Sequence, residues 1–280
     1  MSSFFSWDEP EGLAARGTLI VLAGRGEHGG VYERFGRRLA FDAYRVRALG
    51  DPSADPSVLD EAAKLLADDS LPGPKVLVGS DTGARYAAAL AAEGTAGVDA
   101  VILAGLPTAD GAPGGREDAA GTGGESPVAI GGESPVGIGG KAQLSTGGEA
   151  RLAIGEEAEA DVDWEVEVTA RTACPTHQGR LTNDPDFRRG VLFDTPADLP
   201  ELRLDRVTVP VLALHGRDDT ISPLDRALDA YAGARTVVLN GGRHDVLNDA
   251  LHRTVAATIV LFLERLRLSP ELTPIAEEPA

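Results

Sequence analysis

The sequence predicts an α/β protein with a mostly parallel sheet flanked by helices, and three observations support this prediction. Short apolar runs recur along the chain, stretches with helical spacing separate them, and two such blocks flank a region of different composition. Strands that alternate with helical patterns of about 10–15 residues are typical of βαβ units. Because parallel neighbours need a crossover connection, this alternation favours a parallel sheet.

The first block covers residues 1–106. Its segments 18–23, 44–49, 75–79 and 98–104 are short and apolar, and they predict four strands. The stretches 32–41, 58–67 and 82–92 lie between them and predict helices. In the first of these, Tyr32, Phe35 and Leu39 fall on one side and Arg37 and Arg38 on the other, as in a helix that covers a core.

The second block covers residues 209–268 and resumes the same alternation. Segments 210–214 and 235–239 predict strands, and 223–232 and 246–266 predict helices. In the last helix Leu251, Val255, Ile259 and Phe262 recur every three or four residues. The two blocks therefore read as halves of one sheet, with residues 269–280 as a tail.

The insertion between the halves covers residues 107–208 and has two parts. Residues 123–154 divide into the octads GGESPVAI, GGESPVGI, GGKAQLST and GGEARLAI, whose paired glycines disfavour a fixed backbone. We expect a flexible surface segment there. Residues 163–206 contain Trp164, Phe187 and Phe193 and predict a small lid.

The composition narrows the class of partner. With 26 Lys and Arg against 44 Asp and Glu, the net charge of −18 repels nucleic acids and anionic membranes, so we expect a small-molecule substrate. The single cysteine, Cys174, excludes an intrachain disulfide, and it forms a poor metal site with His177 alone. Lacking a recognisable signal segment or a long apolar span, the sequence predicts a cytoplasmic protein without metal or cofactor.

The strongest motif is Gly79-Ser80-Asp81-Thr82-Gly83, which follows a predicted strand and opens a predicted helix. A sharp strand-to-helix turn of this kind exposes its central side chain and needs small residues two positions before and after it. The two glycines place Asp81 at the centre, since centring the turn on Ser80 would put a valine at a tight position. Asp81 is therefore the candidate nucleophile.

Two later loops complete an ordered trio. Residues 215–223 (HGRDDTISP) and 240–245 (NGGRHD) each follow a predicted strand. The order nucleophile, acid, histidine, with each residue on a loop after a strand, is typical of nucleophile-elbow enzymes. Loops at one edge of a parallel sheet can bring Asp81, Asp219 and His244 together.

With these motifs the sequence resembles the α/β-hydrolase superfamily, and within it the lysophospholipase and monoglyceride-lipase-like branch. The resemblance covers roughly residues 17–106 and 209–268 and implies the α/β-hydrolase fold with an inserted lid region. It is carried by the elbow at 79–83, the acid loop at 216–223, the histidine loop at 242–248, and the segment 24–28 (GRGEH) with Tyr32.

The resemblance implies that Asp219 is the acid, while Asp110 is a rival because some dehalogenases place the acid there. It also implies an oxyanion site formed by the backbone N–H of Thr82 and one N–H from Gly24, Arg25 or Gly26. His28 and His177 are further candidates for substrate binding. Ala23 departs from the family, which usually has the histidine of an HG motif at this position.

Aspartate in place of the usual serine changes the chemistry. A carboxylate is already anionic at pH 7 and can displace a leaving group at a saturated carbon, giving an alkyl ester on Asp81. His244, oriented by Asp219, would then activate the water that hydrolyses this ester. Attack on a carboxylic ester would instead give an anhydride, so epoxides or organohalides are the expected substrates.

The lid does not supply the expected partner groups of known aspartate-nucleophile hydrolases. Thr82 stands where dehalogenases usually have tryptophan, and all four tyrosines lie outside the insertion, whereas epoxide hydrolases use two lid tyrosines. Arg171, Thr172, His177 and Arg180 are candidate donors instead. Two alternatives remain open: an ester or thioester hydrolase in which Asp81 acts as a base, and a catalytically silent hydrolase fold that binds a ligand.

Overall fold

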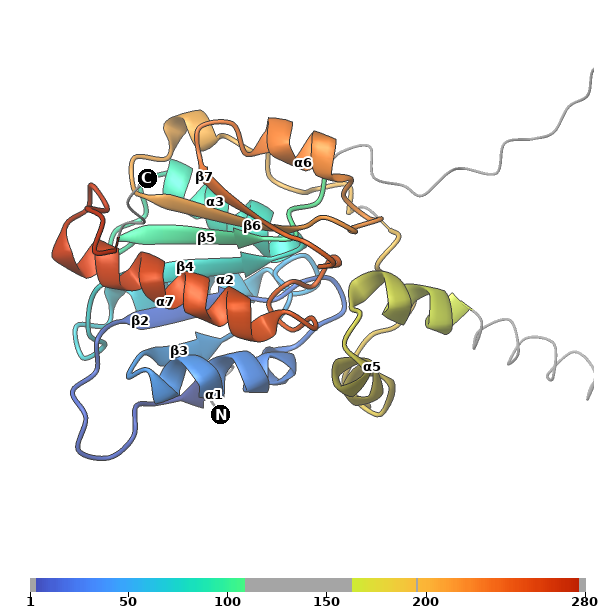
Figure 1. The fold of residues 1–280 in the computed structure, drawn as a ribbon, viewed down its shortest axis with the longest axis horizontal. Coiled ribbons are helices and arrows are strands. Elements are labelled where there is room, and N and C mark those ends of the chain that lie inside the picture. Colours follow the sequence, from blue (N-terminus) through green and yellow to red (C-terminus); the bar gives the residue numbers. More distant parts are fainter. Residues whose placement is uncertain (1–3, 109–162, 195, 277–280) are drawn as a thin grey trace, which may run out of the picture. The chain divides into compact units, whose positions relative to one another are not determined.

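The computed structural model describes residues 4–108, 163–194 and 196–276. These residues form a seven-stranded sheet in the order β1-β3-β2-β4-β5-β6-β7 (Figure 1). The central strands are β2 (Thr18–Leu22), β4 (Lys75–Ser80) and β5 (Ala100–Ala104), which pair in parallel. The outer strands are β1 (Phe5–Trp7), β3 (Arg45–Ala48), β6 (Val211–Gly216) and β7 (Arg235–Leu239). The predicted mostly parallel sheet is therefore confirmed.

Helices cover both faces of this sheet. On one face lie α1 (Glu33–Phe41) and α7 (His252–Leu268), and on the other α2 (Ser57–Ala67), α3 (Thr82–Ala92) and α6 (Leu224–Ala230) (Figure 1). Successive residues of β2 serve the two faces, with Leu19 and Val21 in one core and Ile20 and Leu22 in the other. A strand buried on both faces explains the continuous apolar run in the sequence.

Two details differ from the sequence prediction. The strand β1 was not predicted; it runs antiparallel to β3, and its residues Phe5 and Ser6 are exposed, so it lacks the apolar pattern of the central strands. The last helix begins at His252 rather than at residue 246. Val246 and Leu247 are buried in a loop instead, and the Asp249 carboxylate accepts hydrogen bonds from the backbone N–H groups of Arg243 and Ala173.

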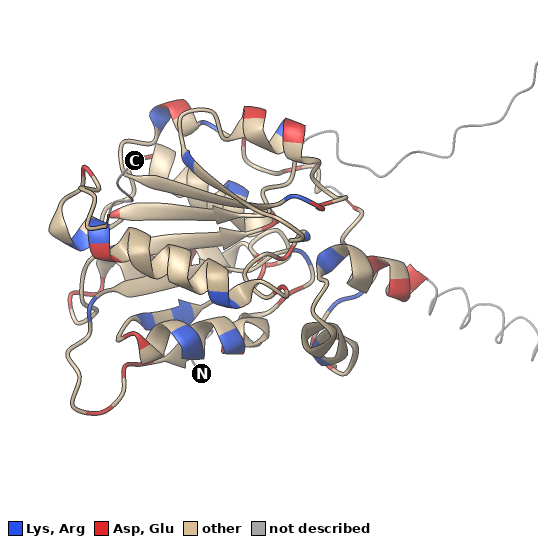
Figure 2. Ribbon diagram, viewed as in Figure 1, with Lys and Arg blue, Asp and Glu red and all other residues tan. Residues whose placement is uncertain are grey.

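The described part of the insertion contains a helix over residues 163–171 and α5 (Pro175–Thr182), which lie together at one end of the sheet (Figure 1). The short 3-10 helices are η1 (Gly29–Tyr32) and η2 (Leu204–Arg206). Acidic and basic residues both occur in the 163–171 helix (Figure 2). The octads at 123–154 and the rival acid Asp110 lie outside the described residues.

In the part of the chain that the structure describes, none of the helices combines the length and apolar character needed to cross a bilayer.

Candidate active site

The turn between β4 and α3 has a strained backbone centred on Asp81. This residue adopts φ 49° and ψ −123°, and such a positive φ is rare for residues other than glycine. A Cβ on Gly79 would lie 2.3 Å from the Cα of Ala84, and one on Gly83 would lie 2.2 Å from the carbonyl oxygen of Leu22. The glycines thus permit the close approach that the motif predicts, and the structure places Asp81 at the centre of the turn.

His244 links Asp81 to Asp219. Its Nδ1 lies 2.8 Å from Oδ2 of Asp219, and its Nε2 lies 3.1 Å from Oδ1 of Asp81. The other oxygen of Asp219 accepts hydrogen bonds from the backbone N–H groups of Ile221 at 2.8 Å and Ser222 at 2.9 Å. The Asp219 carboxylate is therefore held in one orientation, and through it the imidazole of His244.

Arg25 binds both oxygens of the Asp81 carboxylate. Its backbone N–H and its Nε each donate to Oδ2 at 2.8 Å, while Nη2 donates to Oδ1 at 2.7 Å. The remaining terminal nitrogen, Nη1, donates to the carbonyl of Asp194 at 2.8 Å. Sequence reasoning proposed Arg25 for its backbone N–H and missed this two-pronged side-chain contact. An arginine between two glycines on the loop facing the elbow was the available signal.

These contacts decide the charges of the site. Burial alone would raise the pKa of Asp81, but the Arg25 guanidinium and the hydrogen bond from His244 outweigh burial and hold it well below its usual range. Burial would lower the pKa of His244, yet the charges and hydrogen bonds of Asp219 and Asp81 raise it to about 9. The resting site therefore contains two carboxylates, a guanidinium and an imidazolium, whose formal charges cancel.

The loop after β2 offers one of its three candidate N–H groups to Asp81. The N–H of Gly24 donates instead to Glu27 and to the hydroxyl of Tyr32, and the N–H of Gly26 donates to Asp51. The N–H groups of Gly24 and Gly26 therefore do not reach Asp81, which leaves Arg25 among the three residues that the sequence analysis offered for this role. The backbone N–H of Arg25 donates to Oδ2 of Asp81, while Thr82 follows Asp81 directly at the start of α3.

Glu27 belongs to a buried polar cluster beneath this loop. Its carboxyl accepts hydrogen bonds from Gly24 and Tyr32 and lies 3.7 Å from Nη1 of Arg171. Burial, and then the charge of Asp245, raises the pKa of Glu27 to about 8. The group is therefore mostly protonated at neutral pH, which lets it fill an interior position without a full charge.

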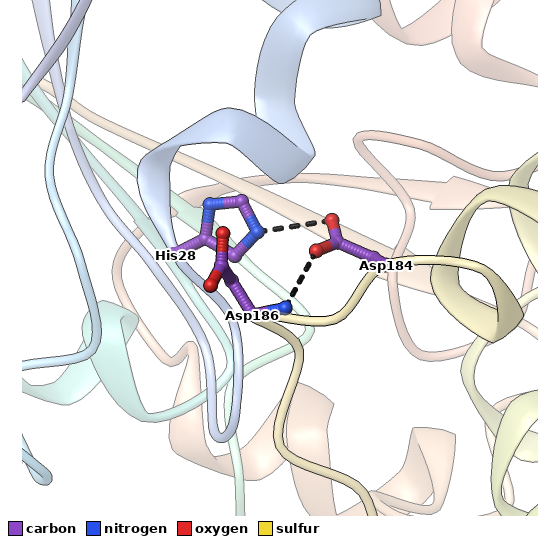
Figure 3. Close-up of side chains that lie close together, drawn as sticks. All are labelled: His28, Asp184 and Asp186. Atoms are coloured by element: carbon purple, nitrogen blue, oxygen red, sulfur yellow. Dashed lines mark hydrogen bonds and ion pairs between the residues drawn. The ribbon is translucent and has the colours of Figure 1, made fainter.

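His28 lies away from the triad, against the lid. Its Nε2 is 3.0 Å from Oδ2 of Asp184, whose other oxygen accepts the backbone N–H of Asp186 (Figure 3). These three side chains are close enough to suggest a cation site. However, Nδ1 of His28 accepts the N–H of Gly30, so the ring proton is on Nε2 and that nitrogen has no lone pair for a metal. We therefore interpret the cluster as a contact between loop and lid.

The lid donors proposed from the sequence bind structural partners rather than Asp81. His177 pairs with Asp245 at 2.8 Å, and Thr172 donates to Asp249 at 2.9 Å. Arg171 binds Glu167 at 2.8 Å and the backbone carbonyl of Arg25 at 2.9 Å, and Arg180 binds Glu33 at 2.9 Å. The expectation that they act on substrate is not supported by this geometry. Through His177, Thr172 and Arg171 the lid is attached to the loops that carry Asp245, Asp249 and Arg25.

Two cavities are lined by Arg25 or by sequence neighbours of Asp219 and His244. The larger, of about 750 Å³, is lined by lid residues including Val166 and Phe193 and by Asp218, Thr220 and Arg243, the sequence neighbours of Asp219 and His244. The smaller, of about 210 Å³, lies against Arg25 and includes Arg188 in its lining. Asp81 is only 3% exposed and His244 2%, so both side chains are covered in this structure.

Comparisons with known proteins agree with this architecture. A sequence model described as "Alpha/beta hydrolase family" matches residues 12–257. Among solved structures, the monoacylglycerol lipase of Paleococcus ferrophilus is 14% identical, with a TM-score of 0.58 over 95% of this chain and 99% of the lipase. The esterase EaEST of Exiguobacterium antarcticum is 17% identical, with a TM-score of 0.58 over 93% of this chain and 95% of the esterase.

The proline iminopeptidase of Mycobacterium smegmatis is 18% identical to this chain, with a TM-score of 0.58 over 95% of each chain. These identities support the fold and leave the substrate open, because the neighbours' stated activities differ. A search among curated proteins finds no significant sequence match.

Proposed function

Because this chain belongs to the alpha/beta hydrolase family, we propose that it is a hydrolase whose nucleophile is Asp81. His244 is the general base and Asp219 its orienting acid. The observation that carries this proposal is the division of labour between the two oxygens of Asp81. Oδ2 accepts the backbone N–H of Arg25, while Oδ1 faces His244.

In the first step, Oδ1 attacks a saturated carbon of an epoxide or organohalide. The bond from that carbon to the halogen or oxirane oxygen breaks, and its electron pair goes to that atom. A halogen leaves as halide, whereas the oxirane oxygen stays on the substrate and takes up a proton from solvent. Oδ2 then becomes the carbonyl oxygen of an alkyl ester on Asp81, and it already lies on the N–H that will hold the oxyanion. Neither oxygen has to move far between resting carboxylate and ester.

In the second step, His244 removes a proton from water, which attacks the carbonyl carbon of the ester. The tetrahedral intermediate places its negative charge on Oδ2, where the N–H of Arg25 stabilises it. The bond between the carbonyl carbon and the alkyl oxygen then breaks, and the alkyl oxygen takes the proton of the new carboxyl group, which releases the alcohol and restores the Asp81 carboxylate. Since the ester has no charge, it no longer raises the pKa of His244, and the imidazolium releases its proton to solvent before the neutral imidazole acts as the base.

The ester or thioester alternative, in which Asp81 acts as a base on water, finds less support. A carboxylate whose pKa lies well below its usual range is a weaker base than an ordinary aspartate. The silent-scaffold alternative is favoured by one observation, the covered ion pair between Arg25 and Asp81. A trapping experiment separates it from the covalent route.

The test is intact-protein mass spectrometry of His244→Gln after exposure to pooled epoxides, haloalkanes and haloacids. This variant keeps the nucleophile but lacks the base, so we expect an adduct that maps to Asp81 and persists. The double variant His244→Gln with Asp81→Asn is the control for alkylation elsewhere. If a folded protein shows no adduct at Asp81 with any pool, covalent catalysis is contradicted and the silent scaffold is favoured.

A further inference from the structure

The Arg25 guanidinium occupies the oxygen that must attack. Oδ1 of Asp81 receives Nη2 of Arg25 at 2.7 Å and Nε2 of His244 at 3.1 Å. Lone pairs engaged by two charged donors are poor nucleophiles, so the contact from Arg25 to Oδ1 has to break before displacement can occur. The backbone N–H of Arg25 can stay on Oδ2 throughout.

A guanidinium released here needs another anion. Arg25 is 4% exposed and remains protonated, and an unpaired buried charge is strongly unfavourable. Asp51 and Asp194 also act on Arg25 electrostatically. The Asp51 carboxylate already accepts the backbone N–H groups of Gly26 and Ser53, and Asp194 binds Arg25 through its backbone carbonyl. The substrate is then the natural source of the replacing charge.

We propose that Arg25 is the receptor for a carboxylate of the substrate, which makes the substrate a short carboxylic acid with a halide on the carbon next to the carboxylate. This inference rests on the proposed function of Asp81. A planar carboxylate matches the fork of a guanidinium with two parallel hydrogen bonds. The substrate carboxylate would replace Asp81 on the side chain of Arg25.

The distances suit an α-substituted acid. Because Nη2 of Arg25 and Oδ1 of Asp81 are 2.7 Å apart, a carboxylate on the guanidinium brings its neighbouring carbon close to Oδ1. Productive displacement needs the reacting atoms within about 3–3.5 Å. The cavity of about 210 Å³ against Arg25 compares with the ~30 Å³ occupied by one liquid water molecule, which is room for an acid of a few carbons.

The charge balance also fits. The resting group of Asp81, Asp219, Arg25 and His244 is neutral while His244 carries its proton, so the acid adds one negative charge. Oδ1 forms a bond to the α-carbon as the carbon–halogen bond breaks, and the halide leaves with the bonding electron pair. That departure restores neutrality. Water then hydrolyses the ester, releasing a 2-hydroxy acid, and the proton of the water passes through His244 to solvent.

The first test compares 2-bromopropionate with 2-bromopropionamide, which has the same carbon skeleton and leaving group but no charge. In the His244→Gln protein we expect the adduct at Asp81 to form at least ten times faster with the acid. Arg25→Gln added to this background should abolish the preference, and Arg25→Lys should keep part of it. The exposed Arg217→Gln is the matched control and should leave the preference unchanged. Peptide mapping separates Asp81 from incidental alkylation of Cys174.

The second test does not depend on covalent chemistry. Calorimetric titration of the unmodified protein with propionate should show binding that Arg25→Gln and Arg25→Lys weaken at least tenfold, with Arg217→Gln unchanged. If the adduct forms faster with the amide than with the acid, Arg25 is not a carboxylate receptor, while the role of Asp81 as nucleophile still stands. Absence of any Asp81 adduct refutes the nucleophile, and absence of propionate binding refutes the receptor whatever the mass spectra show. Circular dichroism of each variant verifies folding.

Discussion

Replacing Asp81 by asparagine should lower the pKa of His244 by at least one unit. The asparagine keeps the shape of the side chain and removes its charge, as alkylation would. The pKa of His244 is raised to about 9 by Asp219 and Asp81 acting against burial. Removing one of the two anions therefore removes part of that elevation.

The minimum size of the effect follows from the 3.1 Å between Nε2 of His244 and Oδ1 of Asp81. Even at the dielectric constant of bulk water, opposite unit charges at this separation attract by about 1.3 kcal/mol, which is about one pKa unit. A buried site screens less than water, so one unit is a lower bound. In the variant the unmatched charge of Arg25 acts in the same direction.

The measurement is an NMR titration of the histidine rings. The chain has five histidines, and the resonance missing from a His244→Gln spectrum identifies the relevant ring. Asp218→Asn, an exposed neighbour of Asp219, is the control and should shift the titration by far less. An unchanged or higher pKa in Asp81→Asn would refute the argument that charge loss at Asp81 turns His244 into a base.

Three further predictions concern stability. The pKa of Glu27 is raised to about 8 in the folded state, so the folded state keeps this proton to a higher pH than the unfolded state does. The free energy of unfolding should therefore fall by at most about 4 kcal/mol as pH rises from about 4.5 to 8, measured by chemical denaturation. The variant Glu27→Gln should not show this fall. Gly83→Ala should destabilise the protein by about 3 kcal/mol or more in urea unfolding, because the new Cβ would collide with backbone atoms. Gly179 lies in α5 with open space where a Cβ would be, so Gly179→Ala should stabilise the protein by about 0.5–1 kcal/mol in the same assay. His177→Ala should leave the Asp245 carboxylate buried and unpaired. We expect this to lower the free energy of unfolding by about 3 kcal/mol and to speed proteolysis of the lid. Adding Asp245→Ala should recover part of the lost stability.

The sequence was most informative where local sterics or composition decide the structure. Apolar runs buried on both faces predicted the central strands, and the limits of α3 and β7 agree with the expected ranges. The two glycines of the elbow identified Asp81 because a Cβ at either position collides with backbone. These properties belong to short segments and need no knowledge of distant contacts.

Prediction failed where the partner is far along the chain. Arg25 and Asp81 are 56 residues apart, and nothing in the local pattern tells whether a loop arginine turns inward or toward solvent. The contacts of the lid side chains could not be predicted for the same reason, since His177 reaches Asp245 across 68 residues. The start of α7 was misplaced because buried Val246 and Leu247 fit a helical period while lying in a loop.

Arg25 also changes how the exchange of serine for aspartate at the elbow should be understood. A serine at position 81 would leave the guanidinium of Arg25 buried without a counter-ion, at a cost of about 3–5 kcal/mol for a broken buried pair. The two residues therefore form a unit: aspartate supplies the charge that makes an inward arginine tolerable, and the arginine keeps the aspartate ionised. It follows that Asp81→Ser alone is a poor route to esterase activity, and that a double exchange with an uncharged residue at position 25 is the fairer comparison with serine members of the family.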